Sequence, residues 1–137
     1  MNVLLSIKQK WVRRILVGAK KLEFRKSFPD NVDKIFLYVS YPQKKIIGYI
    51  TTDCVYKSTI KDLKEFCLKH YPDFDSEEEG FDDYFRIKPE GVVIRIDDVF
   101  VFDVPINPYE LDGFKPPQSY YIVNKELEEF ILGKISG

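Results

Sequence analysis

The sequence predicts an α+β fold, a mixed β-barrel of five to six strands flanked by helices. Short strand-like segments alternate with helical ones, but few have the spacing of βαβ units, which favours a mixed barrel over a parallel sheet. Aromatic residues make up 15% of the 137 residues, which indicates a packed interior rather than disorder. This length is typical of one domain, so we expect residues 1–137 to form a single domain.

The first helix and the strand after it have the clearest local patterns. Residues 3–8 predict a short strand, and residues 9–17 carry apolar side chains at helical spacing. Gly18 is the expected end of this helix. Residues 20–26 alternate between apolar and charged side chains, which predicts a half-buried strand. Its apolar face would hold Leu22 and Phe24, and its charged face Lys21, Glu23 and Arg25.

Two strands and a helix are expected next. The strands cover residues 34–40 and 45–52, with turn residues between them. The helix covers residues 59–70, and either Ser58 or Thr59 would cap it. Together with the strand at residues 20–26, the pattern therefore places three strands after the first helix.

The acidic segment and the apolar run that follows it predict a second helix and a long strand. Residues 76–85 have a helical stripe of aromatic side chains, and Ser76 with Glu79 forms a capping box exposed to water. Residues 91–104 are rich in Val, Ile and Phe, which predicts one long bent strand or two. The turn or bulge would lie at residues 97–98.

Prolines mark the last connection before a carboxy-terminal helix. Asn124 would cap that helix, which we expect to run through Leu132. We interpret the connection as a wall of the site rather than a linker, because no second domain boundary follows it. Its prolines are Pro105, Pro108, Pro116 and Pro117.

Several classes of protein are disfavoured by what the sequence contains. Residues 1–8 lack the features of a signal peptide, and no apolar run is long enough to span a membrane, so we expect a cytoplasmic protein. Cys54, Cys67 and the single histidine, His70, are too few for a disulfide framework or a zinc site, and we expect no metal or cofactor. A Cys67–His70 nucleophile pair has the right helical spacing but lacks an orienting third group.

Charge is distributed unevenly along the chain. Residues 1–48 hold eight Lys and three Arg against three carboxylates, a formal charge of +8, whereas residues 49–137 hold 10 basic and 19 acidic residues, a charge of −9. This split suggests an anion-binding face near the amino terminus. A solvated mixture of both signs is the alternative.

Three segments carry polar side chains that a core does not require. They read Leu-Ser-Ile-Lys at residues 5–8, Gly-Ala-Lys-Lys-Leu-Glu-Phe-Arg-Lys at 18–26, and Pro-Pro-Gln-Ser-Tyr at 116–120. In order and type they resemble the ASCH family, and the segment at 18–25 is the most specific part of the match. The resemblance implies a PUA-like mixed β-barrel with a cleft beside the first helix, used for RNA or a nucleoside.

The side chains of these segments suit such a ligand. Lysine and arginine can hold phosphates, aromatic rings can stack on bases, and Gln118 with Ser119 can read a base edge or a sugar hydroxyl. Tyr41 and Tyr121 are further stacking candidates. The expected partner is RNA or a modified nucleotide, bound in a regulatory role. The binding residues would be Ser6, Lys8, Trp11, Lys20, Lys21, Glu23, Arg25, Lys26, Gln118, Ser119 and Tyr120.

Each assignment has a purely structural alternative. Trp11 has the position of a core residue on its helix. Lys21, Glu23 and Arg25 could form a cross-strand charge ladder on a solvated face. The side chains at 118–119 could bond only to the backbone at the end of a proline turn.

Catalysis is a second hypothesis, with Lys20 and Glu23 as catalytic residues. Some ASCH proteins resemble hydrolases of acetylated cytidine that use a lysine, a threonine and a glutamate. Lys20 matches the lysine, but Glu23 stands where the nucleophilic threonine is expected, so threonine chemistry does not carry over. Others resemble ribonucleases that pair a lysine with hydroxyl groups, here Ser119 or Tyr120. A protein-interaction module is the third hypothesis.

Overall fold

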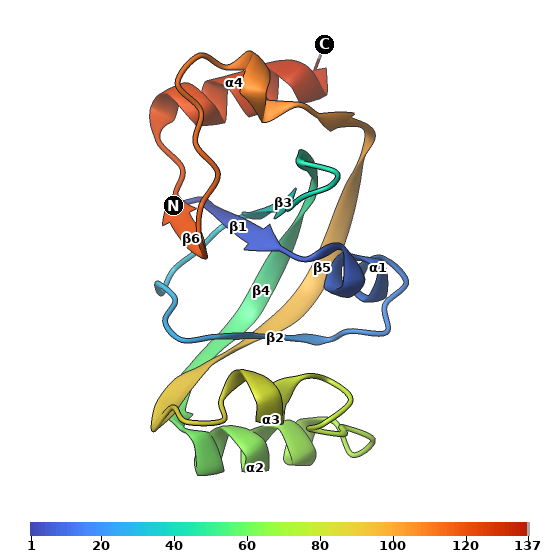
Figure 1. The fold of residues 1–137 in the computed structure, drawn as a ribbon, viewed down its shortest axis with the longest axis vertical. Helices are drawn as coiled ribbons and strands as arrows, with labels where there is room; N and C mark the ends of the chain where they lie inside the picture. Colours follow the sequence, from blue (N-terminus) through green and yellow to red (C-terminus); the bar gives the residue numbers. More distant parts are fainter. Residues whose placement is uncertain (137) are drawn as a thin grey trace.

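The computed structural model describes residues 1–136 and contains one six-stranded sheet with helices packed around it (Figure 1). Its helices and strands, in chain order, are β1 (Val3–Ile7), α1 (Gln9–Leu16), β2 (Leu22–Arg25), β3 (Ile35–Val39), β4 (Lys45–Thr59), α2 (Ile60–His70), α3 (Phe81–Tyr84), β5 (Glu90–Ile106), the short 3-10 helix η1 (Pro108–Glu110), β6 (Tyr120–Ile122) and α4 (Lys125–Ser136).

The sheet is mixed and curls into a half-barrel. Its strand order is β2-β5-β4-β3-β1-β6, in which β1 and β3 are parallel and the other neighbours are antiparallel. The two long strands β4 and β5 pair along most of their length and form the centre of the sheet (Figure 1). The predicted mixed barrel of five to six strands is therefore confirmed, with six.

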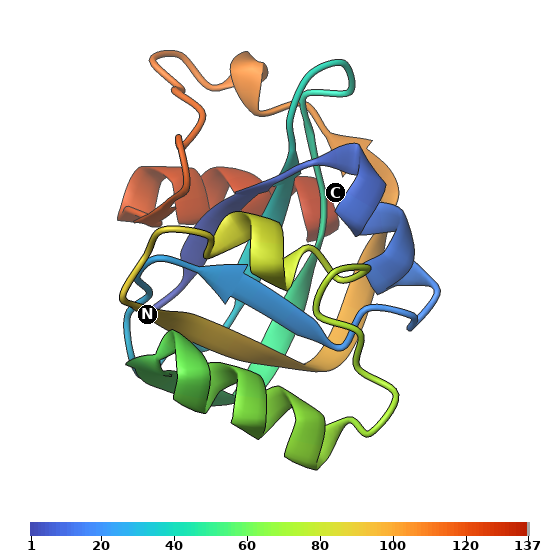
Figure 2. The same cartoon turned by 60° about the horizontal axis from the view of Figure 1, so that its bottom comes forward.

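Three apolar clusters hold this arrangement together. The first fills the inside of the curled sheet and includes Val12 and Ile15 of α1. The second packs Leu127 and Ile131 of α4 against one end of the sheet. The third joins Leu22 and Phe24 of β2 to α2 and α3 at the opposite end. Figure 1 shows α2 and α3 together below the sheet, and Figure 2 shows α3 next to β2. α4 thus covers one end of the sheet, and α2 and α3 cover the other.

Most signals that depend on neighbouring residues are confirmed. The chain leaves α1 at Gly18, whose φ of 76° is easily adopted only by glycine. The Thr59 hydroxyl caps α2 by accepting the Asp62 amide, and the Asn124 side chain caps α4 by accepting the Leu127 amide. The expected bulge at residues 97–98 lies where the register of β5 against β4 shifts.

The capping box predicted at the acidic segment is wrong. The Asp75 carboxylate accepts the amides of Glu77 and Glu78 there, and the Ser76 hydroxyl donates to the carboxylate of Asp82. Residues 76–80 consequently form turns, and the helix covers only Phe81–Tyr84. The Glu79 amide, which Ser76 was expected to cap, donates to the Asp75 carbonyl instead, so Asp75 takes the place of Ser76.

Strand pairing explains the two largest differences from the predicted strands, a longer β4 and an additional β6. β4 continues to Thr59, seven residues beyond the predicted end, because its second half pairs with residues 90–95 of β5. β6 was not predicted, since three residues after a proline loop carry no strand pattern; it exists because it pairs with residues 3–5 of β1. Within residues 1–136, no helix combines the length and the apolar composition that crossing a membrane requires.

Candidate functional site

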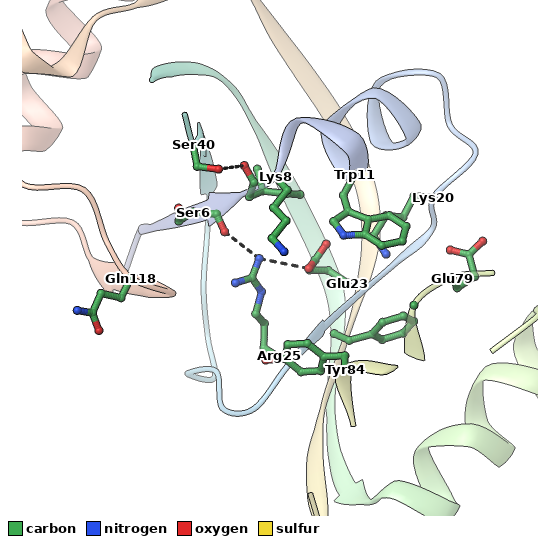
Figure 3. A pocket seen from close by; sticks show the side chains of 13 residues that line it. Ser6, Lys8, Trp11, Lys20, Glu23, Arg25, Ser40, Glu79, Tyr84 and Gln118 are labelled. Carbon is green, nitrogen blue, oxygen red and sulfur yellow. Dashed lines mark hydrogen bonds and ion pairs between the residues drawn. The ribbon is translucent and has the colours of Figure 1, made fainter. Parts of the chain in front are cut away.

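A pocket of about 360 Å³ lies between α1, β2, the end of β1 and the segment before α3 (Figure 3). We call it the α1–β2 pocket. It is lined by Ser6, Ile7, Lys8, Trp11, Lys20, Glu23, Phe24, Arg25, Ser40, Glu79, Gly80, Tyr84 and Gln118. Three of these residues are cationic and two are acidic, so the pocket is mixed in charge rather than uniformly basic.

The turn after α1 directs Lys20 into this pocket. The amides of Ala19 and Lys20 both donate to the Arg14 carbonyl, at 2.8 and 3.0 Å, which folds the chain back beneath the helix. Because β2 begins only at Leu22, Lys20 lies outside the regular strand. Strand alternation therefore does not separate Lys20 from Glu23, and both line the pocket.

Lys20 is buried, with 3% of its surface exposed. Its ammonium group lies 4.7 Å from the ring centres of both Trp11 and Phe24, a cation–π arrangement. No hydrogen bond or ion pair to this ammonium group is found within residues 1–136. Burial lowers the pKa of Lys20, and the attraction of Glu23 and Glu79 offsets this only partly.

Glu23 and Arg25 form a buried pair on β2. Glu23 Oε1 lies 3.2 Å from Arg25 Nη2, which also donates to the Ser6 carbonyl at 2.9 Å (Figure 3). Arg25 Nη1 reaches the Ser119 hydroxyl at 3.4 Å, so the guanidinium links β2 to the chain around β1 and β6. Two buried atoms of the pair, Glu23 Oε2 and Arg25 Nε, have no hydrogen-bond partner in the described part of the chain.

The outer wall of the pocket comes from the segment before α3. The Glu79 carboxylate receives a hydrogen bond from Arg14 Nη2 at 2.8 Å, which ties this segment to α1. Gly80 has a φ of 80°, and a Cβ there would lie 3.0 Å from the Trp11 ring. A larger residue at Gly80 would therefore push the wall away from Trp11. Tyr84 completes the wall with a second aromatic ring (Figure 3).

Seven of the residues predicted for the site line the pocket, and four lie elsewhere. Ser119 contacts it through Arg25, and Tyr120 packs against Phe28 with a ring-centre distance of 5.2 Å. Lys21 and Lys26 line separate surface hollows instead. The seven are Ser6, Lys8, Trp11, Lys20, Glu23, Arg25 and Gln118.

The purely structural explanations of the predicted site residues hold for some of them and fail for others. The solvated charge ladder is wrong for Glu23 and Arg25, because their side chains are only 8% and 12% exposed. Trp11 is both a core residue and a pocket residue, since it packs on the inner apolar cluster and also lines the pocket. The Ser119 side chain bonds to Arg25 rather than to the backbone.

Sequence reasoning missed Glu79, Gly80 and Tyr84. Glu79 lies in the acidic run that was predicted to face water, yet its side chain is only 17% exposed. No local pattern distinguishes it from Glu77 and Glu78, because its position depends on the ion pair with Arg14. Phe24 and Ser40 also line the pocket without having been predicted.

The geometry does not support Cys67 as a nucleophile. Cys67 is fully buried, and desolvation raises the pKa of its thiol to about 12. The His70 ring instead packs against Phe66, with a ring-centre distance of 4.5 Å. Among residues 1–136, no three side chains of His, Cys, Asp or Glu gather in a way that could hold a metal ion.

Comparison with solved structures finds the same fold in ASCH proteins. The crystal structure of ASCH from Zymomonas mobilis is 21% identical, covers 96% of this chain and 94% of its own, and has a TM-score of 0.79. A serine-to-alanine mutant of that protein is 20% identical, with coverages of 97% and 95% and a TM-score of 0.79. These likenesses identify the PUA-like fold.

A more distant structure shares the architecture. The N-terminal domain of McrB from Staphylothermus marinus is 12% identical, covers 97% of this chain and 93% of its own, and has a TM-score of 0.56. No curated protein matches the chain. The family model of the ASCH domain, however, matches residues 5–100, which is more than half of the sequence, and the chain therefore belongs to the ASCH domain family.

Proposed function

We propose that the α1–β2 pocket binds RNA or a modified nucleotide without transforming it, with a base inside the pocket and phosphates at its rim. The observation that carries the proposal is the combination of aromatic walls and buried polar groups in one pocket. Trp11 and Tyr84 offer ring surfaces, and each base that stacks on an aromatic side chain contributes about 1–3 kcal/mol. The proposal includes a regulatory role, through recognition of a particular RNA.

The rim supplies charge where a sugar–phosphate backbone would lie. Lys8 and Gln118 are exposed residues at the edge of the pocket. Lysine side chains neutralise phosphates and release their counterions, so they contribute to affinity without selecting a sequence. Lys26, in the neighbouring hollow, extends the cationic surface for a longer RNA.

Salt dependence and one substitution test the proposal. Binding of labelled RNAs to the protein should weaken steeply as salt rises from about 50 to about 200 mM, whereas binding of a single modified nucleoside should change little. Lys20→Ala should weaken either ligand several-fold, and Lys21→Ala, which alters a side chain outside the pocket, should cost less. If a panel of RNAs and modified nucleosides shows no saturable binding, the proposal fails.

A second candidate function is hydrolysis of an N-acylated cytidine or of RNA phosphodiesters. It is favoured by Lys20, whose pKa is lowered by burial in the same pocket as Glu23 and Glu79. A lysine with a lowered pKa and a nearby carboxylate can exchange protons with a substrate. Glu23 also forms an ion pair with Arg25, which is the simpler use of its charge.

Turnover measurements separate the two candidates. If the pocket is catalytic, Lys20→Ala and Glu23→Gln should each lower the rate by roughly 100- to 10,000-fold, with folding intact. If it only binds, acetylated cytidine and RNA should stay intact during long incubation with the wild-type protein. Product release that Lys20→Ala abolishes would replace the binding proposal with the catalytic one.

A further inference from the structure

We propose that the floor of the α1–β2 pocket recognises a planar ring that presents an N–H donor beside a hydrogen-bond acceptor. The N–H would donate to Glu23 Oε2, and the acceptor would receive a hydrogen bond from the Lys20 ammonium group. Cyclic amides and the hydrogen-bonding edges of nucleobases have this chemistry. The inference rests on the proposed function and names the chemical group that the pocket selects.

The free oxygen of Glu23 is the first observation. Its other oxygen lies 3.2 Å from Arg25 Nη2, but Oε2 is buried without a partner in residues 1–136. An ionised carboxylate can only accept hydrogen bonds, so this position requires a donor. Folded proteins rarely leave a buried acceptor unpaired, and such an atom in a pocket indicates a ligand group or a bound water.

The second observation is the ammonium group of Lys20. Glu23 Oε2 requires a hydrogen-bond donor, whereas this ammonium group requires an acceptor. It is a donor without acceptor capacity, and it lies 4.7 Å from the ring centres of Trp11 and Phe24, with no hydrogen bond to it found within residues 1–136. A ligand that satisfies both Glu23 and Lys20 must therefore carry a donor and an acceptor together. Arg25 Nε is a further buried donor without a partner, and it adds to the demand for an acceptor.

Arg25 itself is largely occupied. Its terminal nitrogens contact the Glu23 carboxylate, the Ser6 carbonyl and the Ser119 hydroxyl. The guanidinium thus orients Glu23 Oε1 and leaves Oε2 for the ligand. Arg25 is a positioning residue in this arrangement, and the selective contacts belong to Glu23 and Lys20.

The position beside Glu23 Oε2 disfavours an anionic group, even though Lys20 and Arg25 are cations. A phosphate or carboxylate at this position would lie against the Glu23 carboxylate in a buried setting, where repulsion between like charges is strong. A neutral planar ring avoids this repulsion and can stack on Trp11 or Tyr84. The pocket volume of about 360 Å³ admits a ring of the size of a nucleobase.

The experiment uses a matched pair of small probes, α-pyridone and N-methyl-α-pyridone. Both are planar rings with a carbonyl acceptor, and only the first has an N–H donor beside it. Trp11 is the only tryptophan in the sequence, so its indole N–H gives one assignable NMR signal at the pocket. Titration of the wild-type protein should shift this signal with α-pyridone, and N-methyl-α-pyridone should bind about tenfold or more weakly, because Glu23 then lacks its donor.

Two substitutions and their controls assign the selectivity to residues. Glu23→Gln should reduce the preference for α-pyridone over its N-methyl form to about twofold or less, since an amide can donate as well as accept. Lys20→Met should weaken both probes by a similar factor of about tenfold, because both carry the acceptor. Glu65→Gln and Lys69→Met change exposed residues of α2 and should leave both affinities unchanged.

The outcomes separate this inference from the proposed function. Equal affinity of the wild-type protein for the two probes, or no binding of either, overturns the inference even if RNA binds. Selective binding of α-pyridone without binding of any RNA or nucleoside supports the inference and overturns the proposed function. If Glu23→Gln fails to fold by circular dichroism, the comparison of the two probes on the wild-type protein still decides.

Discussion

At the α4 end of the half-barrel the buried Tyr38 hydroxyl is hydrogen bonded to the Tyr109 hydroxyl at 2.7 Å. In the α1–β2 pocket, which we call the α1 end, one oxygen of Glu23 has no partner within residues 1–136. The α4 end also pairs the Tyr121 hydroxyl with the Lys115 carbonyl at 2.7 Å. Both ends bury polar atoms, but only the α1 end leaves them unpaired in the described part of the chain. The difference supports the proposal that the α1 end binds a ligand, whereas the paired polar groups of the α4 end serve stability.

Ion pairs show the same contrast. At the α4 end, Lys134 reaches Glu110 at 3.0 Å on a surface where both side chains are about half exposed, so the pair adds little to stability. At the α1 end, Glu23 and Arg25 are almost fully buried, and their charges strongly affect each other and any ligand. A surface pair can be lost without consequence, whereas the buried pair organises the pocket floor.

The largest expected effect on stability comes from removing a buried aromatic ring at the α4 end. Phe36 is fully buried in the cluster beneath α4, and Phe36→Ala should lower the free energy of unfolding by about 3–5 kcal/mol. Urea denaturation measures this loss. Leu132→Ala, at a position 46% exposed, is the control and should change stability by about 0.5 kcal/mol or less. A loss below about 1 kcal/mol for Phe36→Ala would contradict the structural role of this end.

Removal of one paired hydroxyl should have an intermediate effect. Tyr38→Phe deletes the hydrogen bond to Tyr109 and should cost about 1 kcal/mol in the free energy of unfolding, measured in the same way. Tyr109 is 44% exposed, so water can satisfy its hydroxyl in the variant. Ligand binding at the α1–β2 pocket should not change, because the Tyr38 side chain packs in the cluster beneath α4 and does not line the pocket. A weakened ligand affinity would show that the two ends are coupled.

Removal of the Lys20 charge should have the smallest effect on stability. Unlike the two substitutions above, it should stabilise the protein. Because burial lowers the pKa of Lys20 below the usual 10.5, the folded state holds this proton less tightly than the unfolded state. Lys20→Met should therefore raise the melting temperature near neutral pH, by about 2 °C.

The pH dependence of this rise in melting temperature tests whether the buried charge of Lys20 is its cause. The penalty for burying the lysine is present below its folded-state pKa and disappears as pH rises to 10.5, where the unfolded lysine also loses its proton. Scanning calorimetry of both proteins from pH 7 to about pH 10.5 should show the two melting temperatures converging. A melting temperature lowered by Lys20→Met at neutral pH would mean that the contacts of the ammonium with Trp11 and Phe24 outweigh its desolvation.

The sequence by itself determined the features that depend on nearby residues. The end of α1 at Gly18, the caps at Thr59 and Asn124, and the apolar side of β2 follow from backbone preferences and periodicity within a few positions. The motif around Lys20 and Glu23 also identified the family and most of the pocket floor. These inferences needed no knowledge of which strands pair.

Only the tertiary structure decided what those residues meet. Glu79 and Tyr84 reach the pocket because Arg14 binds Glu79 across 65 positions in the chain, a contact that no local pattern encodes. β6 forms only because β1 offers it a pairing edge, and Glu23 is buried because α1 and the segment before α3 close over β2. Burial and pairing are properties of distant segments brought together, so the unpaired oxygen of Glu23 became visible only in the folded chain.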